Sequence, residues 1–267
     1  MPDNPTLLCE MKSAAPIQPE AEIRKRVDRR FVLQEAIVTR AAHELSLSTD
    51  LYYTPRVIGY SIADQLLCLE RLADLVPLRD LLADDRVLYW VLSRVARALA
   101  FLHARLQIPA DQRVPVPAGW MMGETHPVTL HGDFNLINIT WQSSSNRLVI
   151  LDWSSAPALG FIATVGPREL DIAHFLRCLL LQQTAVGKAM YRYAALRDIF
   201  LKEYQTSSPV PIHHKRLARI ICRLNRAILF KQFRQGKVRS LAHSILGQCR
   251  FERDRLRPPS FIPQDQP

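Results

Sequence analysis

The sequence predicts an α+β fold with two lobes, a small N-terminal lobe that contains strands and a larger, mainly helical C-terminal lobe. Short apolar runs bounded by turn residues fall in the first part of the chain and in one central segment. Apolar residues at helical spacing dominate the second half. A chain of 267 residues is long enough for one large domain or two lobes. We place the lobes at residues 1–72 and 73–267.

The N-terminal lobe is expected to hold one strand, one helix and one hairpin. The apolar run at 6–12 predicts a strand, and residues 56–60 and 66–69 predict the two strands of a hairpin. A helix is predicted over about 22–45, because apolar residues recur there at helical spacing. These residues are Phe31, Val38, Ala42 and Leu45.

The C-terminal lobe is expected to begin with a long helix over about 85–103, followed by an irregular, Pro- and Gly-containing stretch at 107–127. A strand, a turn and a second strand come next, up to Trp153. A loop then extends to Pro167. The remaining helices are predicted at 169–183, 188–204, 212–230 and 238–248.

Composition limits the class of protein. No apolar run of about 18 residues occurs, and the N-terminus lacks the basic start and long apolar core of a secretory signal. The five cysteines are scattered with no close pair, which argues against a zinc site and favours a reducing compartment. We therefore expect a cytoplasmic protein with no transmembrane segment.

The positive charge is concentrated near the C-terminus. Residues 1–204 hold 22 Lys and Arg against 22 Asp and Glu, whereas residues 205–267 hold 13 against 3, so the net charge of +10 comes from this last part. Such a field favours an anionic partner, such as a phosphorylated substrate, a membrane surface or a nucleic acid. A solvated basic face that keeps the protein soluble is an equally good interpretation.

The most informative segment is HGDFNLINI at 131–139 with VILDW at 149–153. Asp133 lies five residues before Asn138, and Asp152 lies fourteen residues after it. Phosphoryl transfer needs one carboxylate to orient the attacking hydroxyl, and an amide and a second carboxylate to hold Mg²⁺. Each element alone is a weak signal, and a surface hairpin with incidental polar residues is the alternative. The whole series in this order favours the catalytic interpretation.

Two further residues support this loop. His131 is expected to brace it through hydrogen bonds and packing, since no partner His or Cys lies at metal-ligand spacing. Gly132 would let the backbone turn tightly.

The segment HGDFNLINI followed by VILDW resembles the signature of the aminoglycoside phosphotransferase and choline kinase-like family of small-molecule kinases. GPRELDIA at 166–173 resembles the start of that family's next large helix, and FVLQE at 31–35 its αC-like helix. The resemblance implies a protein-kinase-like fold with ATP and Mg²⁺ as cofactors. It implies Asp133 as the catalytic base, Asn138 and Asp152 as Mg²⁺ ligands, and Asp171 as a brace of the catalytic loop.

The resemblance also implies a strand lysine that grips the phosphates and pairs with a helix glutamate. Glu35 is the candidate glutamate, because it shares the apolar side of its helix. Lys12 is the candidate lysine at the end of the strand at 6–12, although an exposed N-terminal lysine is an equally good interpretation. Lys25 is the alternative, and the prediction that it lies on the same helix as Glu35 excludes it. The adenine pocket is expected at a hinge at 69–72 that includes Glu70 and Leu72, with an ordinary strand end as the alternative.

The sequence departs from the family in two respects. Only eleven residues precede Lys12, and no Gly-rich motif occurs before Gly59, so the first hairpin of the N-terminal lobe is expected to be missing. The predicted helix at 212–230 carries a basic stripe, which argues against a polycationic aminoglycoside and favours a neutral or anionic hydroxyl compound. The alternatives are a kinase-like or nucleotide-binding protein with little turnover and, more weakly, a basic C-terminus that binds anionic membrane or nucleic acid.

Overall fold

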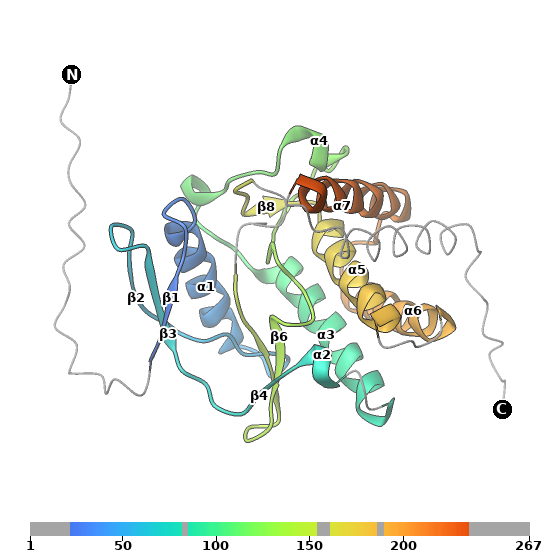
Figure 1. Ribbon diagram of the computed structural model, residues 1–267, viewed down its shortest axis with the longest axis horizontal. Helices are drawn as coiled ribbons and strands as arrows, with labels where there is room; N and C mark the ends of the chain where they lie inside the picture. Colours follow the sequence, from blue (N-terminus) through green and yellow to red (C-terminus); the bar gives the residue numbers. More distant parts are fainter. Residues whose placement is uncertain (1–21, 82–84, 154–160, 186–189, 235–267) are drawn as a thin grey trace.

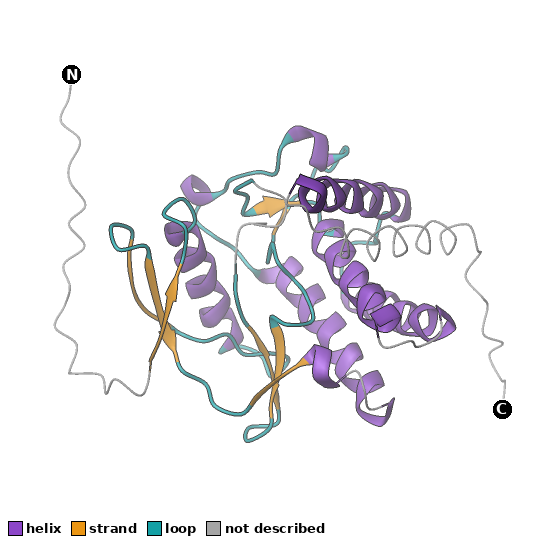
Figure 2. Ribbon diagram, viewed as in Figure 1, coloured by secondary structure: helices purple, strands orange, loops and turns teal. Residues whose placement is uncertain are grey.

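The strands of the N-terminal lobe and the helices of the C-terminal lobe lie on opposite sides of a central hairpin (Figures 1 and 2). The computed structural model describes residues 22–81, 85–153, 161–185 and 190–234. The predicted α+β fold with two lobes is confirmed. The predicted strand at 6–12, which includes Lys12, and the predicted helix at 238–248 lie outside the described residues.

In the described part of the chain the N-terminal sheet has three antiparallel strands, β1 (Glu22–Arg26), β2 (Val57–Ser61) and β3 (Leu66–Glu70), in the order β1-β3-β2. The predicted hairpin is confirmed as β2 and β3. Strand β1 pairs with β3 along its whole length, from Glu22 opposite Glu70 to Arg26 opposite Leu66. This central position of β3 brings the start of the described chain next to the end of the hairpin.

The prediction of a helix from residue 22 is wrong for its first ten residues. Helix α1 spans Val32–Ser46. Before it, the chain turns at Asp28, whose carboxylate accepts hydrogen bonds from the backbone and side chain of Arg30. Such a side-chain contact two residues ahead favours a turn over a helix. The turn separates β1 from α1 and places their side chains on different elements.

Helix α1 connects the cores of the two lobes. Its residues Val32 and Ala36 pack with Leu67 in a small core under the N-terminal sheet. Val38 and Ala42, further along the helix, belong to the large core of the C-terminal lobe. One helix therefore buries apolar side chains in both cores, which fixes the N-terminal sheet against the rest of the protein.

The central sheet confirms the predicted strand, turn and strand. It consists of β4 (Leu75–Pro77), β6 (Ile139–Gln142) and β7 (Arg147–Ile150), in the order β4-β6-β7. The turn between β6 and β7 ends at Asn146, whose φ of 53° lies in the left-handed region that asparagine tolerates. Leu148, Val149 and Ile150 are all fully buried, so β7 is held on both faces.

The C-terminal lobe is built mainly of helices. The predicted helices at 85–103, 169–183 and 212–230 are confirmed, as is the predicted helix at 188–204 from residue 190, where the described chain resumes. The helices are α2 (Leu78–Leu81), α3 (Asp85–Arg105), η2 (Ala110–Gln112), α4 (Ala118–Met121), α5 (Glu169–Ala185), α6 (Met190–Ser207) and α7 (His214–Arg234). The predicted loop up to Pro167 contains one element that the sequence did not indicate. Strand β8 (Val165–Gly166) pairs with β5 (Val128–Thr129), and a pair of two-residue strands has no detectable period. None of the helices in the described part of the chain is both long enough and apolar enough to cross a membrane.

Phe200 on α6 provides a test of the helical core. Its ring is fully buried and stacks on Phe175 of α5, with 4.5 Å between the ring centroids. We expect Phe200→Ala to lower the free energy of unfolding by about 3–5 kcal/mol in chemical denaturation, because it leaves a cavity. The matched control is Phe233→Ala on α7, whose side chain is 71% exposed and should change stability by less than about 0.5 kcal/mol. Equal losses in the two variants would contradict this description of the core.

Candidate active site

The loop between β5 and β6 is held in place by one buried carboxylate. Asp171, in the first turn of α5, accepts hydrogen bonds from the backbone N–H groups of His131 (2.8 Å) and Gly132 (3.0 Å). Its Oδ2 also lies 3.1 Å from Nε2 of His103. Burial would raise the pKa of Asp171, but the hydrogen bond and charge of His103 outweigh it, so this pKa lies below its ordinary value. A charged Asp171 thus orients two consecutive peptide groups of the loop.

Gly132 and His131 shape the loop. Gly132 has a φ of +84°, a conformation that a side chain would strain. Nε2 of His131 lies 2.9 Å from the carbonyl oxygen of Leu151, and Nδ1 accepts a hydrogen bond from the backbone of Asp133 (3.2 Å). Its ring packs on Trp153, and burial lowers the pKa of His131. A neutral His131 uses both ring nitrogens inside the protein, so neither remains for a metal ion.

Asp133 and Asn138 lie side by side. Nδ2 of Asn138 donates hydrogen bonds to the backbone oxygen and to Oδ2 of Asp133, both at 3.0 Å. Asn135 keeps this turn closed, because its Oδ1 accepts hydrogen bonds from the backbones of Ile137 and Asn138. With Nδ2 turned toward Asp133, the amide oxygen of Asn138 is left to accept another ligand.

Asp152 follows the end of β7 and has an unusual backbone conformation. Its φ is +54°, in the left-handed region that few residues other than glycine adopt. On one side Leu151 donates its N–H to Asn138 (2.8 Å), and on the other Trp153 is buried. Backbone strain of this kind persists where the surroundings fix it, and it is common at functional sites. The turn directs the Asp152 carboxylate toward the N-terminal lobe, where it meets Lys25.

Lys25 joins the two lobes through ion pairs. Its Nζ lies 2.6 Å from Oε1 of Glu35 and 3.0 Å from Oδ1 of Asp152. Burial works against the charge of Lys25, but the two carboxylates outweigh it and raise the pKa of Lys25. The exclusion of Lys25 was therefore wrong, because it rested on a helix that does not begin until residue 32. The turn at Asp28 was the signal in the sequence that could have separated Lys25 from that helix.

A cavity of about 290 Å³ opens beside this ion cluster. Both Glu70 and Leu72 line it, together with Lys25 and Asp152. The Glu70 carboxylate is already bonded, since it accepts hydrogen bonds from the hydroxyl of Tyr53 (2.7 Å) and the backbone of Arg56 (3.1 Å). The side chain of Glu70 thus holds the end of β3, and its backbone N–H donates a hydrogen bond to the carbonyl oxygen of Arg56 (2.9 Å).

His174, which lies beside Asp133, was not predicted from the sequence. It sits on α5, is 8% exposed, and its Nδ1 lies 3.6 Å from Oδ1 of Asp133. Burial disfavours the imidazolium form, but the neighbouring Cys178 and Asp133 favour it more strongly, so the pKa of His174 is raised. Asn138 and His174 thus lie on the two oxygens of one carboxylate and fix its orientation.

The donor set suits a hard cation. The described residues contain no cluster of three His, Cys, Asp or Glu side chains that could hold a metal ion. The candidate ligands are instead the amide oxygen of Asn138 and the carboxylate of Asp152. Mg²⁺ prefers oxygen ligands, keeps several of its waters, and is usually bound through one or two carboxylates plus phosphate oxygens. These residues therefore fit a Mg²⁺ ion that shares its coordination with a phosphorylated ligand.

Comparison with solved structures identifies the fold. The chain is similar to aminoglycoside phosphotransferase APH(3'')-Id from Streptomyces rimosus ATCC10970, with 14% sequence identity over 78% of this chain and 86% of that one, and a TM-score of 0.51. A glucosamine kinase shares 18% identity over 89% and 74% of the two chains, with a TM-score of 0.53. An amicoumacin kinase, hAmiN, shares 13% over 88% and 80%, with a TM-score of 0.54.

These neighbours are all small-molecule kinases of the aminoglycoside phosphotransferase type, and the protein has their fold. The S. rimosus enzyme has a structure with ADP and streptomycin, and the amicoumacin kinase was solved with AMP-PNP and Ca²⁺. No family model and no curated protein sequence matches the chain.

The contact between His174 and Asp133 can be tested by titration. In an NMR titration of the wild-type protein, we expect the imidazolium of His174 to lose its proton at a higher pH than is ordinary for histidine. In Asp133→Asn the negative charge is gone, so the imidazolium is less stable and the proton should leave at a lower pH. The control is Asp198→Asn on α6, whose carboxylate pairs with Arg197 and should leave the titration of His174 unchanged. An identical titration in wild type and Asp133→Asn would contradict the contact.

Proposed function

We propose that this protein is an ATP- and Mg²⁺-dependent phosphotransferase, in the cytoplasm, that transfers a phosphoryl group to a hydroxyl of a small molecule. The observation that carries the proposal is the meeting of Lys25, Glu35 and Asp152 beside the loop of Asp133 and Asn138. Lys25 and Asp152 line one cavity, and the loop of Asn138 and Asp133 is bonded next to it through the backbone of Leu151. The fold shared with small-molecule kinases supports the same reaction.

Each residue then has a defined part in the reaction. Lys25 binds the α- and β-phosphates, and Glu35 holds Lys25 in place. The backbone near Glu70 and Leu72 binds adenine in the adjoining cavity. Asn138 and Asp152 would hold Mg²⁺, which neutralises charge on the phosphates. Asp133 orients the acceptor hydroxyl and takes its proton, as the hydroxyl oxygen bonds to the γ-phosphorus and the bond to the leaving oxygen of ADP breaks.

The acceptor is proposed to be neutral or anionic, in contrast to an aminoglycoside. Among the described residues, the acidic side chains that face the basic helix α7 are Glu124 and Glu169, and both pair with Arg216. The structure therefore leaves neither glutamate for the amino groups of a polycationic substrate. Sugars, amino alcohols with a neutral nitrogen and lipid headgroups are the acceptor classes to test.

Phosphorylation assays with such a panel of hydroxyl compounds test the role of Asp133. We expect Asp133→Asn to lower turnover by roughly 10²- to 10⁴-fold, the usual contribution of a positioned base. The control Asp111→Asn, at an exposed carboxylate in η2, should keep wild-type activity. Full activity in Asp133→Asn would refute its role. Nucleotide binding without any transfer across the panel would instead favour a kinase-like protein with little turnover.

Thermal unfolding with Mg²⁺·ATP tests the nucleotide site separately. Ligand at 100 times its Kd should stabilise the wild-type protein by about 2.7 kcal/mol, and Asp152→Asn should abolish this response. Lys25→Met leaves Glu35 buried without its partner, which costs about 3–5 kcal/mol. The double variant Lys25→Met/Glu35→Gln should recover much of that stability and still fail to respond to nucleotide. The control Lys202→Met, on the exposed side of α6, should respond like wild type, and a normal response in the double variant would exclude Lys25 from the site.

A further inference from the structure

Helix α7 carries a dense positive charge, and none of its side chains was given a part in the proposed phosphoryl transfer. Its basic residues are Lys215, Arg216, Arg219, Arg223, Arg226, Lys231 and Arg234, and the helix contains no acidic residue. Arg216 is neutralised, because it pairs with Glu124 and with Glu169. Arg216 therefore has a structural part in the protein, and the surroundings of the other arginines on this helix are different.

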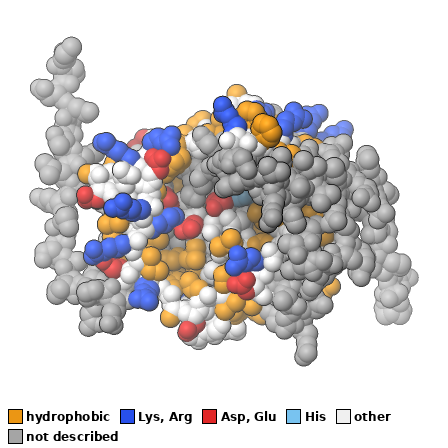
Figure 3. Space-filling model, viewed as in Figure 1, with side chains coloured by type: hydrophobic (Ala, Val, Ile, Leu, Met, Phe, Trp, Pro, Cys, Tyr) orange, Lys and Arg blue, Asp and Glu red, His pale blue; other side chains and the backbone are white. Residues whose placement is uncertain are grey.

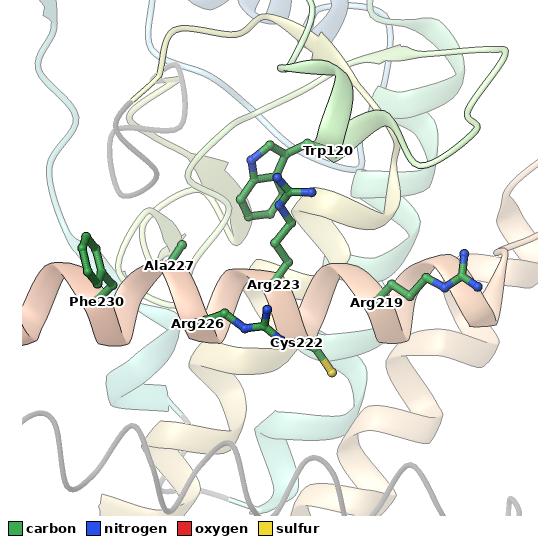
Figure 4. Close-up of a pocket in the computed structure, with 7 residues that line it drawn as sticks. All are labelled: Trp120, Arg219, Cys222, Arg223, Arg226, Ala227 and Phe230. Atoms are coloured by element: carbon green, nitrogen blue, oxygen red, sulfur yellow. The ribbon is translucent and has the colours of Figure 1, made fainter.

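Three of these arginines border a cavity of about 920 Å³ between α4 and α7 (Figure 4). They are Arg219, Arg223 and Arg226, which recur at intervals of four and three residues. Trp120 of α4 and Phe230 of α7 also line the cavity, and Figure 4 shows Arg223 extending from the helix to the Trp120 ring. In Figure 3 Lys and Arg side chains gather along the upper edge of the face shown, over α4 and α7 in Figure 1.

The guanidinium group of Arg223 is held in position without an acidic partner among the residues that the structure describes. It donates a hydrogen bond to the carbonyl oxygen of Gly119 and lies over the Trp120 ring, 4.9 Å from its centroid. A Cβ atom at Gly119 would come within 2.6 Å of Arg223, so the glycine is what allows this close approach. An arginine ordered by a carbonyl and an aromatic face keeps its charge and has lost much of its side-chain freedom before any ligand arrives.

The other two arginines have no partner of opposite charge in the described part of the chain. Arg219 and Arg226 are both exposed, and neither has an ion pair or hydrogen bond with a described residue. No acidic side chain is among the described residues that line the cavity. The cavity also has an apolar part, since Trp120 forms one wall and Phe230, 62% exposed, forms one end.

We propose that the cavity between α4 and α7 binds the phosphate group of a ligand that also carries an apolar or aromatic portion. Arginine is the side chain best suited to this role, because its planar N–H groups match phosphate oxygens in paired hydrogen bonds. The apolar portion would lie against Trp120 and Phe230. This site shares no residue with the cavity beside Lys25, so it is separate from the nucleotide site.

Phosphate next to an apolar group occurs in soluble aryl or alkyl phosphates and in phospholipid headgroups. The first arm of the test is calorimetric titration of the whole protein with phenyl phosphate and with inorganic phosphate, without ATP and at physiological ionic strength. The second arm is sedimentation with phosphatidylcholine vesicles that contain or lack phosphatidylglycerol. We expect saturable binding in at least one arm, and tighter binding of phenyl phosphate than of inorganic phosphate if the ligand is soluble.

The variants separate a built site from a general electrostatic field. Arg226→Ala removes no hydrogen bond or ion pair with a described residue, and it should weaken binding by about tenfold or more, because a charge-assisted hydrogen bond to the ligand is lost. Arg223→Lys keeps the charge and should still weaken binding, because lysine cannot form the paired hydrogen bonds. Lys215→Ala is the matched control: it removes the same charge from α7 outside this cavity and should change affinity less than about twofold.

Two results would overturn the proposal. One is the absence of binding to phenyl phosphate, inorganic phosphate and anionic vesicles alike. The other is an equal loss in Lys215→Ala and Arg226→Ala, because that would mean that only the net charge of α7 matters. Both results are independent of phosphorylation, so they leave the proposed kinase reaction untouched. A protein that fails to bind nucleotide but binds phenyl phosphate would, conversely, keep this site and lose the proposed function.

Discussion

The ion cluster of Lys25, Glu35 and Asp152 is the interaction on which the candidate site depends. Its three members come from β1, from α1 and from the end of β7, so one ammonium group connects both lobes. Glu35 is 2% exposed, and burial raises its pKa while Lys25 opposes that effect. A buried carboxylate of this kind is stable as an anion only with its cation in place. The cluster therefore ties the geometry of the site to the packing of α1 between the two cores.

The part of the candidate site that contains Asp133, Asn138 and Asp152 could be predicted to come together because its residues are close in sequence. Asp133, Asn138 and Asp152 lie on one loop and one hairpin, and the turn at Asn146 returns the chain so that Leu151 bonds to Asn138. The number of residues between these side chains therefore determines how far apart they lie in the structure. The long helices could be predicted for the same reason, because the spacing of their apolar residues is visible within a short stretch of sequence. The two-lobe α+β fold was predicted for this reason.

The other half could not be predicted, because it depends on contacts between distant segments. Strand β1 carries a charged run that resembles an exposed helix surface, and only its pairing with β3 makes it a strand. His174 is one of several polar residues on a mostly buried helix, and its meaning comes from the approach of Asp133. The sequence also does not distinguish two arginines of α7 that have different surroundings in the structure. Arg216 pairs with two glutamates, whereas Arg223 lies over the Trp120 ring.

The charged side chains of the candidate site explain why these segments, distant in sequence, lie close together. Glu35, Asp133 and Asp152 are close enough for the two aspartates to raise the pKa of Glu35, and Lys25 supplies one positive charge against the three carboxylates. His174 lies beside Asp133, with its Nδ1 3.6 Å from Oδ1 of that carboxylate. The region near Asp152 thus keeps an excess of negative charge, which a divalent cation would offset. Such a cation would bind the same carboxylate that Lys25 contacts, so the ion pair between Lys25 and Asp152 joins the candidate phosphate-binding residue to the candidate metal ligand.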